Sequence, residues 1–319
     1  MSKKRIILFA PLFYGYWKHI KKELETFGFE VEFITYRTNK LVDGIIDLSG
    51  ELIKEQSYNT IVRSRIRQLK GKYDYLIVIK GLFFSQENFN LIIDKNSGIK
   101  TIMYQWDSVK NHNYLDFANR FDKVLTFDPV DAETYGFEYL PLFYTNDIIE
   151  AENKFDGKED IDLLLIGIYN KARYEYLQRI KRLSSNLKIY THLVVPPGLY
   201  IRQELLTHKL GLRNKEDFRF SSISRDNLLN LYNRSKVFID VCQNQSGMSM
   251  RTIEAYGMNK KLITGNENVI KGDENLREML TLNISASDNE IIEFVNKPAS
   301  PYRNKEKLSL NVWCRRLLS

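Results

Sequence analysis

The segment 246–254 carries the residue types best suited to bind an anion. Ser246 and Gly247 lie in a loop that follows an apolar run and precedes a helical pattern. Such a loop offers unpaired backbone N–H groups and the positive end of a helix dipole to an anionic ligand. Arg251 and Glu254 lie about one turn apart on the same helix face. This pairing fits a nucleotide sugar, with Arg251 at a phosphate and Glu254 at a sugar diol.

The residues around this segment indicate how it is held. The apolar run 237–241 predicts a buried strand before it, and 262–264 begins the next strand. Ser249 is suited to cap the helix, because a serine oxygen accepts a hydrogen bond from a free N–H at a helix N-terminus. Gly257 ends the helix. Together with Met248, the loop and the helix form the segment that we expect to bind the nucleotide sugar.

A second glycine-bearing loop follows the apolar run 161–167. Gly167 would let the backbone approach a ligand closely, and Arg173 could meet a diphosphate. Neither a Gly-x-Gly-x-x-Gly fingerprint nor a phosphate-binding P-loop is present. We therefore expect Gly167 and Arg173 to meet the diphosphate of the same ligand as the 246–254 segment, and we expect no dinucleotide site here.

Apolar runs alternate with helical patterns along the chain, which predicts parallel sheets covered by helices. Strands are expected at 5–10, 31–35, 75–81, 100–104, 124–128, 138–140, 161–167 and 187–192, besides the two above. Helices are expected at 16–27, 50–70, 85–95, 129–136, 172–184, 199–211, 224–233 and 305–318. The polar, acidic stretch 146–160 reads as a connection. These patterns predict an α/β protein of two Rossmann-like domains, residues 1–145 and 160–300, with a helix in 301–319 that could cross back.

Composition narrows the class of protein. The chain has 319 residues, of which 43% are hydrophobic and 27% charged, values of a soluble globular protein with two domains. Cys242 and Cys314 form no disulfide framework, and with four scattered histidines the sequence predicts no metal site. The opening basic residues precede an apolar run too short for a signal peptide, and no run reaches the roughly 20 residues of a membrane span. A cytoplasmic protein is expected.

The net charge of +7 also limits the partners. Basic residues are interspersed with acidic ones, and no arginine-rich arm or zinc-finger spacing predicts nucleic-acid binding. Phosphorylated substrates or anionic lipid headgroups at the inner face of the cytoplasmic membrane are the expected partners, beside ordinary solvated helix faces.

The segment 251–257, followed by Lys261–Thr264, resembles the donor site of GT-B glycosyltransferases, especially those of bacterial lipopolysaccharide and capsule synthesis. About twenty residues match specifically. Many retaining members have two glutamates eight positions apart, the first at the donor sugar and the second at the donor ribose. Glu254 matches the second position, whereas Ser246 occupies the first. The resemblance thus implies two Rossmann-like domains facing each other across a cleft, with inversion the expected outcome.

An inverting transferase needs a general base for the acceptor hydroxyl. The group Tyr104, Trp106 and Asp107 follows a predicted buried strand, and Asp107 is the first candidate base. Tyr104 and Trp106 could stack on a sugar, although Asp107 could instead cap a helix. The loop after the first strand, with Tyr14, would line the acceptor site, and His19 is the second candidate base.

The sequence therefore predicts a metal-independent transferase without a cofactor, using a nucleotide-diphosphate sugar and a lipid-linked or other glycan acceptor. Two alternatives remain open. One is a polyol-phosphate or CMP-sugar transferase of similar fold. The other is a non-catalytic, two-lobed protein that binds a sugar or a nucleotide.

Overall fold

The computed structural model describes residues 3–155, 157–195, 216–241, 245–271, 276, 278–299 and 301–319. The chain forms two compact units. Unit 1 contains the described residues up to Thr145, the short segment 245–247, and Ser309–Ser319. Unit 2 contains the rest, from Asn146 to Leu308. The helix expected at 199–211 lies outside the described residues.

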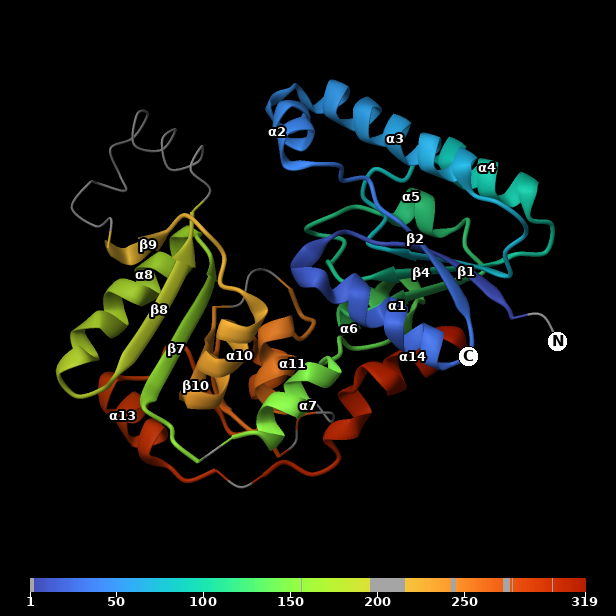
Figure 1. Cartoon of the computed structure of the whole chain (residues 1–319). Helices are drawn as coiled ribbons and strands as arrows, with labels where there is room; N and C mark the ends of the chain where they lie inside the picture. The colour runs from blue at the N-terminus through green and yellow to red at the C-terminus, as the bar shows by residue number, and fades with distance from the viewer. Residues whose placement is uncertain are drawn as a thin grey trace. The chain divides into compact units, whose positions relative to one another are not determined.

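Unit 1 contains a six-stranded parallel sheet in the order β2-β1-β3-β4-β5-β6 (Figure 1). Its strands are β1 (Arg5–Phe9), β2 (Glu30–Ile34), β3 (Tyr75–Ile79), β4 (Lys100–Gln105), β5 (Lys123–Thr126) and β6 (Glu138–Tyr139). Each pair of neighbours runs parallel, as the continuous apolar runs predicted. The chain reverses its direction of travel across the sheet between β1 and β3.

Helices cover both faces of this sheet. They are α1 (Tyr16–Thr26), α2 (Lys40–Leu48), α3 (Glu51–Gln68), α4 (Gln86–Lys95), α5 (Leu115–Ala118), α6 (Pro129–Tyr135) and α14 (Leu310–Leu318), with the short 3-10 turn η1 (Phe13–Gly15). One face packs against α3 and α4, which lie side by side (Figure 1). The terminal helix α14 lies beside α1, where Trp313 packs on Tyr104 and Phe143. Two buried layers therefore flank the sheet.

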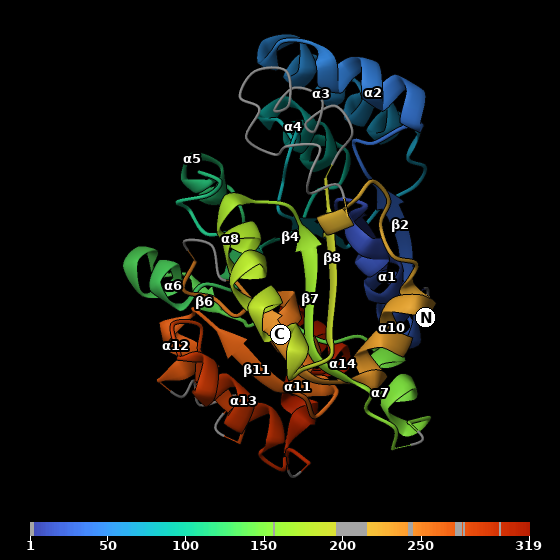
Figure 2. The same ribbon diagram turned by 90° about the vertical axis from the view of Figure 1, so that its left-hand side faces the viewer.

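Unit 2 contains a second parallel sheet of six strands, in the order β12-β11-β10-β7-β8-β9. Its strands are β7 (Ile161–Ile168), β8 (Ile189–Val194), β9 (Phe218–Arg219), β10 (Ser235–Asp240), β11 (Lys261–Thr264) and β12 (Thr281–Asn283). Its helices are α7 (Asn146–Asn153), α8 (Lys171–Ile180), α10 (Arg225–Arg234), α11 (Met250–Gly257), α12 (Glu267–Ile270) and α13 (Asp288–Asn296), with the 3-10 turns η2 (Lys181–Ser185) and η5 (Lys305–Leu308). The α8 and α13 helices pack on one apolar core (Figure 2). The α10 helix contacts β7, and α11 contacts β10.

The stretch 146–160 is not simply a connection, because its first half forms α7. This helix buries only Ile148, and it contacts α10 and α11. An amphipathic helix with one buried residue has too weak an apolar period to be recognised in sequence. Among the described residues, no helix is long and apolar enough to cross a bilayer.

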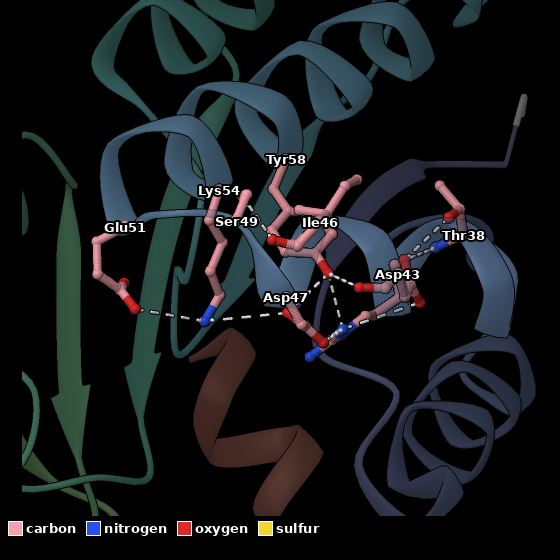
Figure 3. A network of polar contacts seen from close by, with 9 residues as sticks. Thr38, Asp43, Ile46, Asp47, Ser49, Glu51, Lys54 and Tyr58 are labelled. Carbon is pink, nitrogen blue, oxygen red and sulfur yellow. Dashed lines mark hydrogen bonds and ion pairs between the residues drawn. The ribbon is translucent and has the colours of Figure 1, made fainter. Parts of the chain in front are cut away.

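The α2 helix was not predicted, and it attaches to unit 1 in an unusual way. None of its residues is fully buried, and most of its large apolar side chains point outward, with Leu41 79% and Leu48 90% exposed, whereas Ile46 is partly buried against the core of the unit. Its acidic side chains instead face the unit. The Asp47 carboxylate accepts hydrogen bonds from Arg37 and from the Tyr58 hydroxyl, at 2.6 and 3.0 Å (Figure 3). Polar contacts, together with the packing of Ile46, therefore hold α2 against the unit.

We predict that α2 loosens in acid because of Asp47. Burial raises the pKa of Asp47, but hydrogen bonds from Arg37 and Tyr58 outweigh it and lower that pKa below 3.8. The stabilisation of α2 by the Asp47 carboxylate is therefore present above about pH 3.8. It is lost as the pH falls through the lower pKa that Asp47 has in the folded protein. Asp47→Asn should speed amide exchange in α2 a few-fold at neutral pH and remove this acid step.

Hydrogen exchange of the α2 peptide measures both effects. Glu267→Gln, which removes an exposed ion pair with Lys271 in α12, is the matched control and should leave α2 unchanged. An acid step that persists in Asp47→Asn would show that another group controls α2.

Candidate functional site

In unit 2, the direction of the chain across the sheet reverses between β7 and β10, which are neighbours. In open α/β sheets, ligands bind beyond the carboxyl ends of the strands at such a switch point. The loops after β7 and β10 are therefore where a ligand is expected, and both carry the residues singled out above.

The loop after β10 leads into α11 as predicted. Ser249 caps α11, since its side chain accepts a hydrogen bond from Thr252 N–H at 3.2 Å. Asp240, the last residue of β10, accepts hydrogen bonds from the hydroxyls of Ser249 and Thr252 at 2.6 and 2.9 Å. The N-terminus of α11 is thereby fixed to the end of the strand. Met248, also expected in this segment, is 2% exposed.

Glu254 lies on α11 and is only 3% exposed. Its carboxylate accepts hydrogen bonds from Arg225 Nη1 at 2.8 Å and from the Tyr232 hydroxyl at 2.6 Å. Both partners come from α10. Burial raises the pKa of Tyr232 well above its ordinary value, so this hydroxyl stays protonated and donates. A buried carboxylate is tolerated only when such donors compensate its lost hydration.

The contacts of Arg225 and Arg251 extend this network. Arg225 also pairs with both oxygens of Asp147, on α7, at 2.8 and 3.0 Å. Arg251 donates to the Tyr232 oxygen and to the carbonyl of Ile166 at 3.2 Å, so it reaches the end of β7. The structure thus brings Arg251, Glu254 and the β7 end together. Spacing alone could not have identified Arg225, which is 29 residues from Glu254.

Gly167 and Arg173 are also close to each other. A Cβ atom on Gly167 would lie 3.2 Å from Arg173 Nε, so the absence of a side chain lets this guanidinium lie over β7. Arg173 Nη1 donates to Ile168 O at 2.8 Å, and the Asn170 side chain caps α8 by accepting from Arg173 N–H. Glycine here accommodates an arginine of the first turn of α8, and both residues lie at the switch point.

Ser246 and Gly247 group with unit 1, which corrects their assignment to the C-terminal domain. Their N–H groups donate to Asp128 Oδ2 at 2.9 and 3.1 Å. The other oxygen of Asp128 caps α6 by accepting from Val130 N–H at 3.0 Å. The two amides therefore bind a carboxylate of the protein, where the sequence had suggested a phosphate.

In unit 1, the second group of predicted residues lies beyond β3 and β4. Asp107 forms an ion pair with Lys80, the residue directly after β3. His112 lies beside this pair. Its pKa is lowered by burial and by the Lys80 ammonium, against the opposing effect of Asp107. The imidazole is thus mainly neutral at pH 7, and His112 and Lys80 are residues that the sequence analysis missed.

The predicted acceptor-binding aromatics separate into two groups. Tyr104 is fully buried, donates to Leu140 O at 3.1 Å and packs on Trp313, so its side chain belongs to the core. Trp106 is half-buried and Tyr14 half-exposed, and Phe13 contacts both rings. His19 lies within α1, as predicted, and is half-buried.

Among the described residues, no group of three or more His, Cys, Asp or Glu side chains could hold a metal ion. The two candidate sites are built from arginines, a lysine, a histidine, carboxylates and backbone groups. Such groups can bind phosphate and sugar hydroxyls and can transfer a proton.

Comparison with known proteins agrees with this architecture. AviGT4, a glycosyltransferase involved in avilamycin A biosynthesis, superposes with a TM-score of 0.60 at 12% identity, covering 99% of this chain and 96% of that one. The lipopolysaccharide outer core galactosyltransferase WaaB matches with a TM-score of 0.53 at 13% identity, covering 99% and 98%. The chain therefore has the GT-B fold. No family model and no curated protein matches its sequence.

The GT-B fold is shared with an enzyme of another activity. The UDP-GlcNAc 2-epimerase from Neisseria meningitidis, bound to UDP-GlcNAc, matches with a TM-score of 0.55 at 9% identity, covering 99% of this chain and 98% of that one. At such identities the likeness establishes the fold and not the reaction, so the reaction must be argued from the sites.

We predict that Gly247→Ala destabilises the protein. The new methyl group would lie 2.6 Å from the Phe127 ring and 2.7 Å from Phe127 O, and a backbone oxygen cannot move cheaply. Overpacking of this kind costs about 1–3 kcal/mol. Thermal unfolding should show a lower Tm.

Gly44→Ala is the matched control, because a Cβ there meets no atom within 4 Å. Gly44 lies inside α2, where alanine is favoured by roughly 0.5–1 kcal/mol. Equal Tm values for Gly247→Ala and the wild type would contradict the close packing at Gly247.

Proposed function

We propose that this protein is an inverting, metal-independent glycosyltransferase. It transfers a sugar from a nucleotide-diphosphate sugar to a lipid-linked or other glycan acceptor, which we assign to the cell surface. The observation that carries the proposal is the strand–loop–helix of β10 and α11, with Arg251 and Glu254 at the switch point of a GT-B sheet. The names of two matched structures add support, since WaaB is a galactosyltransferase and the epimerase binds UDP-GlcNAc.

On the donor side, Glu254 is the proposed partner of the nucleotide ribose. A carboxylate has about four lone-pair sites, so ribose hydroxyls can share it with Arg225 and Tyr232. Those two donors fix its orientation before the ligand arrives. Binding would then require little rearrangement of this buried group.

Departure of the nucleotide diphosphate needs positive charge. The N-terminal end of α11 provides a partial positive charge, and Arg251 and Arg173 are the candidate phosphate ligands near the end of β7. Groups that are oriented before the reaction stabilise developing charge without reorganising. In this mechanism they perform the role that a divalent ion performs in other transferases.

On the acceptor side, Asp107 is the proposed general base and Lys80 fixes the position of its carboxylate. Trp106 and Tyr14 are the proposed surfaces for an acceptor sugar, because their rings are accessible. In the transfer, the Asp107 carboxylate would take the proton of the acceptor hydroxyl. The hydroxyl oxygen of the acceptor would attack the anomeric carbon of the donor sugar, and the nucleotide diphosphate would leave.

The match with the epimerase makes a second reaction a specific alternative, namely rearrangement of a nucleotide sugar without an acceptor. Incubation of a nucleotide sugar with the protein, with and without glycan acceptors, separates the two. Product formed only when acceptor is present supports transfer.

We expect a nucleoside diphosphate to raise the Tm. A panel of UDP, GDP, dTDP, ADP and CMP identifies the base, and Glu254→Ala should remove most of the shift. Because Glu254 is buried, Glu254→Gln is the second variant, since it retains the volume and tests the charge. If no nucleotide shifts the Tm, the transferase proposal loses its main support, and an undiminished shift in both variants would exclude the ribose role.

We expect Asp107→Asn to lower kcat by at least about 100-fold while donor binding is unchanged, because the proton acceptor is lost. The amide keeps the shape of the side chain. His112→Gln and His19→Gln test the competing bases with the same acceptor assay. Turnover retained by Asp107→Asn, with loss in one histidine variant, would transfer the role to that histidine.

A further inference from the structure

Unit 1 contains a cavity of about 200 Å³ that the sequence analysis did not identify. It lies beyond the carboxyl ends of β3 and β4, where Lys80 and Gly81 follow one strand and Gln105 ends the other. The volume is below the roughly 300 Å³ at which drug-sized pockets begin, and it is far larger than a single water needs. A ligand the size of one small ring would fit it.

Gln105 points to a polar ligand for this cavity. Its side chain lines the cavity and is fully buried. The Nε2 atom donates to Lys80 O at 3.3 Å, whereas Oε1 has no hydrogen-bond partner. Buried polar atoms are nearly always paired in native proteins, and exceptions call for a specific explanation. A ligand hydroxyl that donates a hydrogen bond to Gln105 Oε1 would pair this buried oxygen.

The backbone beside the cavity is strained. Lys80 and Phe83 have φ angles of 65° and 57°, in the left-handed region that non-glycine residues rarely adopt. Lys80 is held there by its N–H bond to Tyr104 O at 2.9 Å and by the Gln105 side chain. Residues kept in such conformations concentrate at ligand-binding sites, where the surrounding structure maintains the strain.

The chemistry of the walls selects the ligand. Phe83, Phe84 and Phe117 supply aromatic surface, which suits the C–H faces of a sugar. Glu55 and His112 add groups that can hydrogen-bond hydroxyls. The cavity's lysine already pairs with Asp107, and Glu55 would repel an anion. The walls therefore favour a neutral, hydroxyl-rich ring over a phosphate.

We propose that this cavity binds one neutral sugar ring, with Gln105 and Glu55 accepting hydrogen bonds from its hydroxyls. The inference deepens the proposed function and rests on it, since the ring would be a unit of the glycan acceptor. His112 borders both this cavity and the Lys80–Asp107 pair. A ring in the cavity would lie next to the proposed base.

Saturation-transfer NMR on the full-length protein tests the proposal, with glucose, galactose, mannose and N-acetylglucosamine as probes. Inorganic phosphate and glycerol serve as the alternative probes. At least one hexose should bind, and Glu55→Gln should weaken it by about tenfold, because the hydrogen bond to a charged acceptor becomes one to a neutral amide. Gln105→Met, which keeps the shape and removes the carboxamide, should weaken it similarly.

Glu51→Gln is the matched control, since Glu51 is an exposed carboxylate one turn earlier on α3 and does not line the cavity. Hexose binding that is absent, or unchanged by both Glu55→Gln and Gln105→Met, would overturn the cavity site. Binding of phosphate in preference to hexoses would do the same. These results are independent of the nucleotide panel: a nucleotide shift without hexose binding leaves the proposed function standing, and hexose binding without a nucleotide shift leaves the cavity site standing.

Discussion

Unit 2 depends on the compensation of one buried negative charge. Glu254 is 3% exposed, and an unpaired carboxylate in that position would be severely destabilising. Arg225 and Tyr232 supply the two donors, and Arg225 must in turn be balanced by Asp147. The positions of α7, α10 and α11 are therefore coupled through charge as well as through apolar contact. The same coupling holds Arg251 against the end of β7.

Both units hold the loops and helices at their strand ends in place, but they use different side-chain groups to do so. In unit 2, carboxylates fix the helix: Asp240 holds the start of α11, and Glu254 joins it to α10. In unit 1, a strained turn after β3 carries Lys80, and the Gln105 side chain bonds to that turn. Both arrangements lie at strand ends, where side chains can project beyond the sheet without disturbing its hydrogen bonds. A parallel sheet thus provides the rigid base, and the loops provide the chemistry.

Much of the fold could be predicted because strands buried on both faces leave continuous apolar runs. The run 237–241, the cap at Ser249 and the helix that follows are local features, so local patterns identified them. The α2 helix was not predicted although its apolar residues recur at helical spacing, and the exposure of its apolar side could not be foreseen from the sequence. The partners of Glu254 and the Asp128 contact with Gly247 were missed because they join residues 22 to 119 positions apart. Such contacts form only when the chain folds, and no periodic pattern in a single sequence indicates them.

The apolar side of α2 faces solvent, and this affects how the protein behaves in salt solutions. Its attachment consists largely of ion pairs and charged hydrogen bonds around Arg37 and Asp47, and concentrated salt weakens such contacts because the Debye length falls to about 3 Å at 1 M. Its exposed apolar side chains, Leu41, Val42, Ile45 and Leu48, respond in the opposite sense, because sulfate and similar salts strengthen apolar association. Concentrated salting-out buffers therefore loosen this helix and make its exposed face more adhesive at the same time. Solubility should be best at modest ionic strength, where both effects are small.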